Sequence, residues 1–377
     1  MLTLEKLLAE LIALPSVNPV LLPDNPAWTG EQRVADFLAH WADRIGLEIS
    51  FQPVFPGRSN LVARLTPAGG RPRQRILLAP HMDTVSVADE SAFKPRKSGG
   101  RLYGRGACDT KGSVAAMFSA ITQIAAKGPR PQQTEIAFLA LVDEEVGQNG
   151  SWTFSKSKQK AHFAIVGEPT RNQVVTAHKG DFWLELTTTG KAAHGARPEL
   201  GQNAVHEMAR AVDLLETKYA RALRKKRHKL LGHPTINVGH IQGGKQPNIV
   251  PDACSILIDR RSLPGETEKS VRKELNDLLG SRDIKVSIAN AKENPCPALE
   301  TDPQHPLARQ LMGVLNQKRP LGVDYFTDAA PLAAQGMPTV VFGPGDIAQA
   351  HTRNEWISIK SLNLATEQLK KFLTELP

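Results

Sequence analysis

The sequence predicts an α/β fold in which a doubly wound, mostly parallel sheet is interrupted by a smaller α+β sandwich. From residue 75 onward, short apolar runs alternate with a helical stretch, which is typical of parallel strands joined by helices. Between residues 175 and 290 the pattern changes to alternating strands with two long amphipathic helices. A β-branched run that breaks at glycines then returns at residues 338–345. The length of 377 residues is sufficient for two domains.

The first part of the chain begins with a predicted helix and continues with buried strands. Leu4, Leu7, Leu8 and Leu11 recur on one face of a helix at the N-terminus. Three short apolar strands and a helix of small residues follow, with the strands at 75–80, 135–142 and 162–166 and the helix at 112–126. Each of these three strands runs directly into polar residues.

The pattern in the middle of the chain predicts a second domain that is inserted into the first domain. Its alternating strands lie at 182–190, 235–244 and 254–263, and its helices lie at 203–223 and 266–280. Because the parallel-strand pattern resumes afterwards, we expect one discontinuous domain formed by residues 1–174 and 291–377. Residues 175–290 would form the insertion, and the length of this segment is suitable for a domain.

The positive charge of the chain is concentrated in one segment. There are 47 Lys and Arg residues against 38 Asp and Glu residues, which gives a net charge of +9. Seven cations and no acid lie between Lys218 and Lys229, so the rest of the chain has a net charge of +2. We interpret this segment as a solvated helix end, and contact with an anionic partner such as a nucleic acid is the alternative.

Other features exclude a membrane protein and a disulfide-stabilised secreted protein. No apolar stretch approaches the roughly 20 residues that span a bilayer. The N-terminus lacks the basic region and uninterrupted apolar core of a secretory signal. Cys108, Cys254 and Cys296 are odd in number and far apart, which argues against a disulfide framework. The sequence therefore predicts a cytoplasmic protein.

Histidines and carboxylates follow the predicted strands at the sheet edge where ligands bind in such folds. They are His81, Asp83, Asp109, Glu144, Glu145, Glu168 and His351. Imidazole and carboxylate donors without cysteine suit Zn²⁺, Mn²⁺ or Co²⁺. A site with two metals needs one carboxylate that contacts both, and Asp109 is the candidate. Taken singly, these residues have structural alternatives: a solvated turn for Glu144 and Glu145, and a helix N-cap for Asp109.

The motifs resemble those of the dizinc amidohydrolases that include acetylornithine deacetylase, succinyl-diaminopimelate desuccinylase, aminoacylase and glutamate carboxypeptidase. The resemblance rests on HMDTV, GRGACDTKG, DEEVG and GEPT in this order, and on GKAAHGARPELGQNAV, NIVPD, DRRSLPGE and QAH further along. It covers nearly the whole chain. It implies a catalytic domain with two metal ions, interrupted by a lid or dimerisation domain, and a homodimer formed through that domain.

The resemblance assigns roles to these residues. It implies that His81, Asp109 and Glu168 hold one metal, and that Asp109, Glu145 and His351 hold the other. Glu144 would be the general base, and Asp83 would orient the imidazole of His81. A cis peptide bond after the bridging aspartate, here between Asp109 and Thr110, also belongs to the family pattern.

The inserted region would supply substrate contacts. His194 is the candidate donor to the oxyanion that forms when water attacks an amide carbonyl. Asn248 and Arg261 match positions that resemble contacts to a substrate carboxylate, and Arg260 is a second possibility. A guanidinium can bind a carboxylate with two hydrogen bonds, so an N-acyl amino acid with a free α-carboxylate fits.

The run Tyr325–Ala329 and the stretch FGPGDIAQAH resemble the acetylornithine deacetylase branch. Asp328 would meet a cationic side chain such as that of ornithine, or would only cap the following helix. The expected activity is hydrolysis of N-acetylornithine to ornithine and acetate by two divalent metal ions, with zinc expected and cobalt or manganese as alternatives. Desuccinylation, peptide hydrolysis and an inactive scaffold that uses the basic segment are the other hypotheses.

Overall fold

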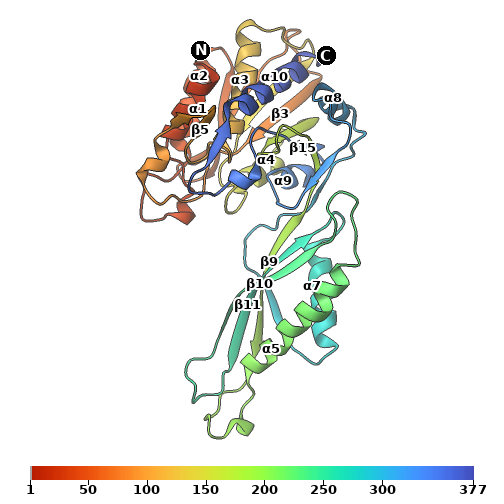
Figure 1. The fold of residues 1–377 in the computed structure, drawn as a ribbon. Coiled ribbons are helices and arrows are strands. Elements are labelled where there is room, and N and C mark those ends of the chain that lie inside the picture. Colours follow the sequence, from red (N-terminus) through yellow and green to blue (C-terminus); the bar gives the residue numbers. More distant parts are fainter. Residues whose placement is uncertain (1) are drawn as a thin grey trace. The chain divides into compact units, whose positions relative to one another are not determined.

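The computed structural model describes residues 2–377, which form two compact units (Figure 1). The first unit contains residues 2–176, 301–321 and 327–377. The second contains residues 177–300 and 322–326, and therefore extends beyond the expected end of the insertion at residue 290. Within this unit, Leu299 pairs with His178 and Glu300 pairs with Ala177. That these units act as a catalytic domain and a lid or dimerisation domain stays a prediction.

The strands within residues 2–377 form three sheets. They are β1 Glu48–Phe55, β2 Arg58–Leu65, β3 Gln74–Pro80, β4 Arg96–Ser98, β5 Arg101–Tyr103, β6 Thr134–Ala140, β7 Phe163–Gly167, β8 Val175–His178, β9 Gly180–Thr189, β10 Thr235–Gly243, β11 Ala253–Ser262, β12 Ser287–Asn290, β13 Leu299–Glu300, β14 Leu321–Val323, β15 Thr339–Val341 and β16 Trp356–Ser358.

The α-helices are α1 Leu4–Ala13, α2 Gln32–Arg44, α3 Lys111–Lys127, α4 Asn149–Lys156, α5 Ala204–Leu214, α6 Ala220–Leu223, α7 Glu268–Gly280, α8 Pro306–Val314, α9 Ala329–Ala334 and α10 Ile359–Thr374. The long helix expected at 203–223 contains a π-helical turn at Leu215–Tyr219 between α5 and α6. No helix among residues 2–377 combines the length and apolar character that crossing a bilayer requires.

The large sheet, most of whose strands belong to the first unit, has a parallel centre. Its strand order is β1-β2-β6-β3-β7-β15-β8-β13, and β14 also pairs with β8. The pairs β6-β3, β3-β7 and β7-β15 are parallel, and β1 and β2 extend the sheet as antiparallel strands. A separate small sheet has the order β16-β5-β4. The parallel centre arises where apolar strands are joined through helices, as the sequence predicted.

The core of the first unit lies between the large sheet and the helices on one of its faces. Alternate residues of β3 and β6, such as Ile76, Leu78, Ile136 and Phe138, pack with residues of α1, α3 and α10. Helix α3 is buried along most of its length. This burial explains why α3 has few charged residues, and its small residues allow neighbouring elements to approach closely.

The second unit has its own antiparallel sheet and its own core. The sheet order is β10-β11-β9-β12, and every pair in it is antiparallel. Leu184, Ile256 and Ile258 pack with Met208 of α5 and Leu275 of α7. The predicted fold class is therefore confirmed: a large, centrally parallel sheet with helices and a separate α+β unit.

Candidate metal centre

The strands β3, β6 and β7 bring their carboxyl ends to one edge of the sheet. They are neighbours in the order β6-β3-β7 and run parallel, so side chains that follow each strand meet. His81 follows β3, Glu144 and Glu145 follow β6, and Glu168 follows β7. All of these residues belong to the first unit.

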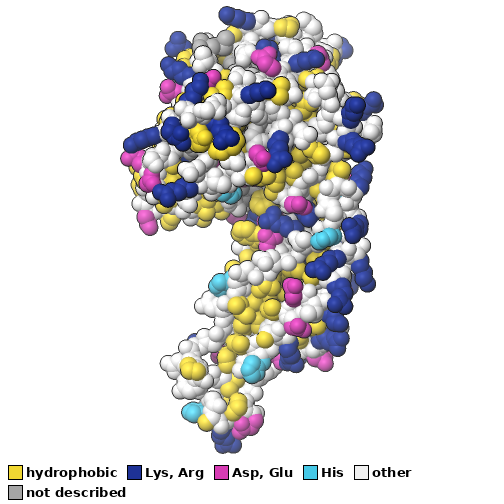
Figure 2. Space-filling view, viewed as in Figure 1, with side chains coloured by type: hydrophobic (Ala, Val, Ile, Leu, Met, Phe, Trp, Pro, Cys, Tyr) yellow, Lys and Arg dark blue, Asp and Glu magenta, His cyan; other side chains and the backbone are white. Residues whose placement is uncertain are grey.

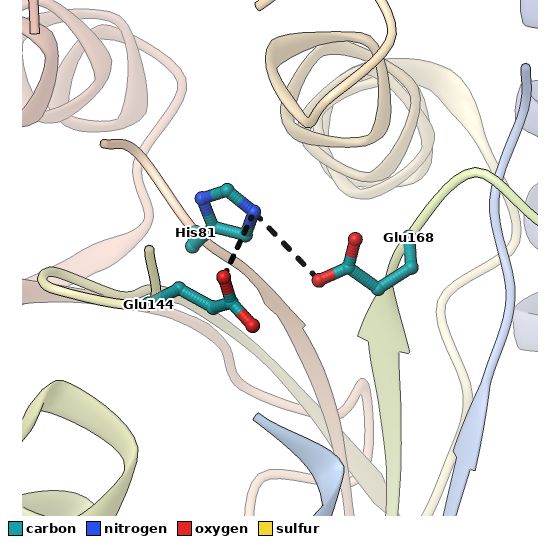
Figure 3. A group of neighbouring side chains, drawn as sticks. All are labelled: His81, Glu144 and Glu168. Carbon is teal, nitrogen blue, oxygen red and sulfur yellow. Dashed lines mark ion pairs between the residues drawn. The ribbon is translucent and has the colours of Figure 1, made fainter. Parts of the chain in front are cut away.

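The carboxylates of Glu144 and Glu168 point toward the ring of His81 (Figure 3). Atom Nε2 of His81 lies 3.9 Å from Oε2 of Glu144 and 3.7 Å from Oε1 of Glu168. These three residues are buried and offer ligand atoms within 4.8 Å of one another. Glu144 therefore lies next to the candidate metal ligands.

Asp109 lies between two histidines. Its Oδ1 atom is 3.2 Å from Nε2 of His81, and its Oδ2 atom is 3.3 Å from Nε2 of His351. The same His351 nitrogen is 3.2 Å from Oε2 of Glu145. Each oxygen of Asp109 thus faces a different histidine, which is the arrangement that a carboxylate shared by two metals requires.

The side chain of Asp109 does not cap the helix that follows it. Helix α3 begins at Lys111 with Thr110 at the N-cap position, and no side chain forms a capping hydrogen bond there. The peptide bond between Asp109 and Thr110 is cis, as the family resemblance implied. The two oxygens of Asp109 are therefore available to the cluster.

Asp83 organises the two strand ends next to the cluster. The main-chain N–H groups of Glu144 and Glu145 donate to its two carboxylate oxygens over 3.0 and 3.1 Å. Atom Nδ1 of His81 lies 3.0 Å from the main-chain carbonyl of Asp83 and 3.4 Å from its carboxylate. Because the carbonyl only accepts, Nδ1 carries the proton and Nε2 faces the carboxylates.

Burial and crowded charge shift the pKa values of this cluster. Burial raises the pKa values of Glu144 and Glu168 well above the ordinary range, with neighbouring carboxylates adding to the effect. Burial, with the charge of Asp109 adding to it, raises the pKa of Glu145 to about 7. Hydrogen bonds to Asp109 and Glu145 raise the pKa of His351 to about 10. The cluster is therefore short of positive charge.

The residues present fit a pair of divalent cations. Atoms Oε1 of Glu145 and Oε1 of Glu168 are buried and have no hydrogen-bond partner within the described chain. The ion-pair partners of Asp109, Glu144, Glu145 and Glu168 are the two histidines. Buried carboxylates without compensating charge are costly, and metal ions would supply both the charge and the missing partners.

The predicted substrate-contact residues His194 and Asn248 lie in the second unit on adjacent segments. Both are exposed. The segments are joined by a bridge between His194 and Ile249, and the N–H of Gly195 donates to the carbonyl of Asn248. The Nδ1 atom of His194 accepts a hydrogen bond from the N–H of Ala196, so its Nε2 atom is left to carry the proton.

The two neighbouring arginines of β11 have different surroundings. Arg260 is fully buried, and its guanidinium donates to Glu266 over 2.8 Å and to the hydroxyl of Tyr219 over 3.2 Å. Its guanidinium is therefore already occupied by partners within the second unit. Arg261 is less buried and forms two hydrogen bonds of 2.9 Å with the carboxylate of Asp259. A substrate carboxylate at Arg261 would have to share this guanidinium with Asp259.

Asp328 occupies the N-cap position of α9 but does not cap the helix with its side chain. Its Oδ1 atom accepts a hydrogen bond of 2.5 Å from the hydroxyl of Ser151, and its Oδ2 atom is buried without a hydrogen-bond partner among residues 2–377. Burial raises its pKa to about 7. The capping alternative is therefore not what the structure shows.

Sequence reasoning missed two residues that support the cluster. The side-chain amide of Asn18 donates to Asp83 over 2.8 Å and to Asp143 over 3.0 Å. Glu355 accepts hydrogen bonds from the main chain around Asp109. Neither residue follows a predicted strand end of the sheet, so the pattern that identified the other residues did not include them. For Glu355, the sequence offered no signal, because its burial and its main-chain partners appear only in the structure.

Comparisons with known proteins identify relatives of this chain. Residues 77–375 match the model of peptidase family M20/M25/M40. An acetylornithine deacetylase of Vibrio cholerae is 31% identical over 91% of this chain and 91% of its own length. One of Pectobacterium carotovorum is 32% identical over 96% of this chain and 95% of its own length.

Solved structures show the same fold. The aminopeptidase PepT from Bacillus cereus has a TM-score of 0.79 at 21% identity, with 99% of this chain and 97% of that one covered. An M20 family metallo-carboxypeptidase from Sulfolobus solfataricus has a TM-score of 0.76 at 20% identity, with 99% of both chains covered. A dinuclear metal-binding M20 peptidase from Bacillus subtilis has a TM-score of 0.68 at 12% identity, over 98% of this chain and 96% of that one.

Proposed function

The chain belongs to peptidase family M20/M25/M40. We propose that it is a dizinc amidohydrolase that converts N-acetylornithine to ornithine and acetate. The observation that carries the proposal is the placement of Asp109 between His81 and His351, next to the buried Glu144 and Glu168 and the partly buried Glu145. Relatives named acetylornithine deacetylase, about 31% identical over most of the chain, support the choice of substrate.

The metal ligands are proposed as two overlapping sets. His81, Asp109 and Glu168 would hold one ion, and Asp109, Glu145 and His351 would hold the other. Imidazole and carboxylate donors favour zinc, and the same donors also accept cobalt or manganese. When bound, the two ions would polarise the substrate carbonyl and make water more acidic.

Glu144 would move the proton during the reaction. Its carboxylate takes a proton from the attacking water while the new C–O bond forms at the acetyl carbonyl. The C–N bond then breaks, and Glu144 returns the proton to the leaving amine, which gives ornithine and acetate. The buried carboxylate of Glu144, 3.9 Å from the ring of His81, lies where it would hold the proton between these two steps.

The remaining predicted residues would orient the substrate. His194 would donate a hydrogen bond to the oxygen that gains negative charge. Asn248 and Arg261 would contact the α-carboxylate, and Asp328 would meet the cationic side chain. The buried, unpartnered Oδ2 atom of Asp328 supports an acceptor role for it.

A homodimer formed through the second unit is part of the proposal. Strand β10 lies at an edge of the sheet, so one of its sides has no neighbouring strand in the described chain. Apolar side chains are exposed on this unit, among them Leu200, Ile241 and Ile249, with 52%, 56% and 40% of their surface accessible. Figure 2 shows apolar side chains (yellow) on the surface of this unit. A second copy of the chain would cover them.

The test of the proposed function is steady-state release of ornithine by protein loaded with zinc or cobalt. Turnover of N-acetylornithine that exceeds turnover of N-succinyl-diaminopimelate and of dipeptides is the expected result. Turnover of one of the other substrates alone would overturn the choice of substrate but not the amide chemistry. No turnover of any of them, together with nucleic-acid binding that weakens steeply with salt, would favour the scaffold hypothesis.

A further inference from the structure

We propose that Glu355 is a positioning residue that holds the loop of Asp109 and the segment of His351 in the arrangement that the metal centre needs. The inference rests on the proposed metal centre and concerns a residue that is not itself a ligand. Glu355 is 2% exposed and belongs to the first unit, as do all of its partners.

The small sheet places Glu355 beside the loop that carries Asp109. Strand β16 pairs with β5 in an antiparallel register that sets Trp356 opposite Tyr103. Glu355 precedes β16, and the loop from Gly104 to Asp109 follows β5, so the two lie next to each other. The N–H of Gly104 also donates to the main-chain carbonyl of Glu355 over 3.1 Å.

The carboxylate of Glu355 accepts three main-chain hydrogen bonds from this loop. Its Oε1 atom accepts from the N–H of Cys108 over 2.8 Å and from the N–H of Asp109 over 2.9 Å. Its Oε2 atom accepts from the N–H of Gly106 over 3.0 Å. Three N–H groups that converge on one carboxylate fix the path of the loop just before the bridging side chain.

Arg105 balances the charge of this buried carboxylate. Its Nη1 atom lies 2.8 Å from Oε2 of Glu355, and its Nη2 atom donates to the carbonyl of Ser86 over 3.2 Å. Arg105 is 7% exposed, so the pair is shielded from solvent. A buried carboxylate that has four donors and an opposite charge is rigid, and removal of its charge would leave donors without an acceptor.

Glu355 also connects the two sides of Asp109. It lies four residues after His351, whose Nε2 atom is 3.3 Å from the carboxylate of Asp109. Through Oε1 it holds the main chain of Asp109 itself. The side chain of Glu355 therefore fixes the position of the Asp109 carboxylate relative to His351. Outer partners of this kind typically change metal affinity by 10–100-fold when they are altered.

The experiment uses the Glu355→Gln variant and Co²⁺ as the probe. A glutamine keeps the size of the side chain. Its NH₂ group, however, must take the place of Oε1 or of Oε2, and in either place it faces N–H donors that need an acceptor. We expect at least a tenfold loss of affinity for the more weakly bound Co²⁺ ion in titrations of the metal-free protein, and an altered visible spectrum of the loaded protein. Glu355→Asp, which keeps the charge and shortens the side chain, should fall between the wild type and Glu355→Gln.

Glu135→Gln is the matched control. Glu135 is a buried acid of β6 that pairs with Arg75 at the opposite end of the strand from the cluster. The Glu135→Gln variant should lose thermal stability without any change in Co²⁺ affinity or in the visible spectrum of the loaded protein. Wild-type affinity and spectrum in both Glu355 variants would refute the positioning role. If Glu355→Gln does not fold, wild-type Co²⁺ binding by Glu355→Asp is sufficient to refute it.

Because this titration uses no substrate, it separates the inference from the proposed function. Wild-type protein that binds two Co²⁺ ions in a Glu355-dependent way but hydrolyses no N-acyl amino acid would leave the inference intact and overturn the function. A wild type that binds no Co²⁺ would overturn the metal centre, and with it both proposals.

Discussion

Asp109 is the residue on which the geometry of the candidate centre depends. Its two oxygens face different histidines, and its main chain is held by Glu355. Glu144, which follows a neighbouring strand, lies 3.9 Å from His81 with its carboxylate buried. The proposed ligands and the proposed base therefore share one compact cluster, and only substitution can separate their roles.

Substitution Glu144→Ala should remove the base while leaving the proposed ligand set complete. We expect kcat to fall by about 10²–10⁴-fold, because the proton transfer loses its acceptor. Metal content, measured by elemental analysis of the purified variant, should stay at two ions per chain. His351→Ala is the comparison, and it should lower metal content. Loss of a metal ion from Glu144→Ala would instead make Glu144 a ligand.

His178 provides a residue-scale prediction about pH and stability. Burial lowers its pKa to about 4, whereas the unfolded chain has the ordinary value near 6.5. The unfolded state therefore binds more protons between these two values, and stability is lost as the pH falls from about 6.5 toward 4. At pH 5 the loss from this group is about 2 kcal/mol.

Unfolding of wild type and His178→Gln at pH 7.5 and pH 5.0 measures this contribution. The wild type should lose about 2 kcal/mol more than the variant between the two conditions, since the other histidines are common to both proteins. An equal loss in the two proteins would mean that His178 is not the group that resists protonation.

Residue-scale reasoning from the sequence identified the cluster but not its supports. His81, Glu145 and Glu168 were recognisable because acids and histidines directly after apolar strands are poor material for a core. Glu355 was not recognisable, because its partners are main-chain N–H groups almost 250 positions away, which leave no mark in side-chain patterns. The pairing of Arg261 with Asp259 depends on side-chain directions that the sequence does not specify.

At the scale of elements, the site follows from three parallel strands. The order β6-β3-β7 was not readable from the sequence, but its consequence was, because the carboxyl ends of parallel strands gather at one edge. The π-helical turn between α5 and α6 was missed, because amphipathic spacing continues through it and gives no local warning. One cation of the basic segment, the half-exposed Lys226, pairs with Glu266 and Glu274 of the second unit, and its other six cations are exposed.

The edge strand β10 carries the element-scale prediction. Substitution Ile241→Lys places a charge on an edge that a second copy is proposed to cover, and should shift the protein from dimer to monomer in sedimentation velocity. Leu364→Lys, at an exposed apolar residue of α10 in the first unit, is the control and should leave the dimer intact. A wild type that sediments as a monomer, or a dimer that tolerates Ile241→Lys, would contradict the proposed interface.

At the scale of the whole molecule, the two units should respond differently to metal. The proposed ligands all lie in the first unit. A ligand that binds only the folded state stabilises it by about 2.7 kcal/mol when its concentration is 100 times the Kd. Calorimetry of zinc-loaded and metal-free protein should therefore show a higher unfolding temperature for one transition, with a second transition nearly unchanged.

In that calorimetric experiment, Asp109→Asn serves as the control, because it should abolish the metal-dependent shift. A shift that persists in this variant would place the metal elsewhere in the molecule.

The most direct test of the central claim, that Asp109 is shared by two metal ions, is anomalous diffraction from crystals of the cobalt-loaded protein. The proposal predicts two anomalous peaks, one beside each carboxylate oxygen of Asp109, with His81 next to the first and His351 next to the second. A single peak, or peaks away from Asp109, would contradict it.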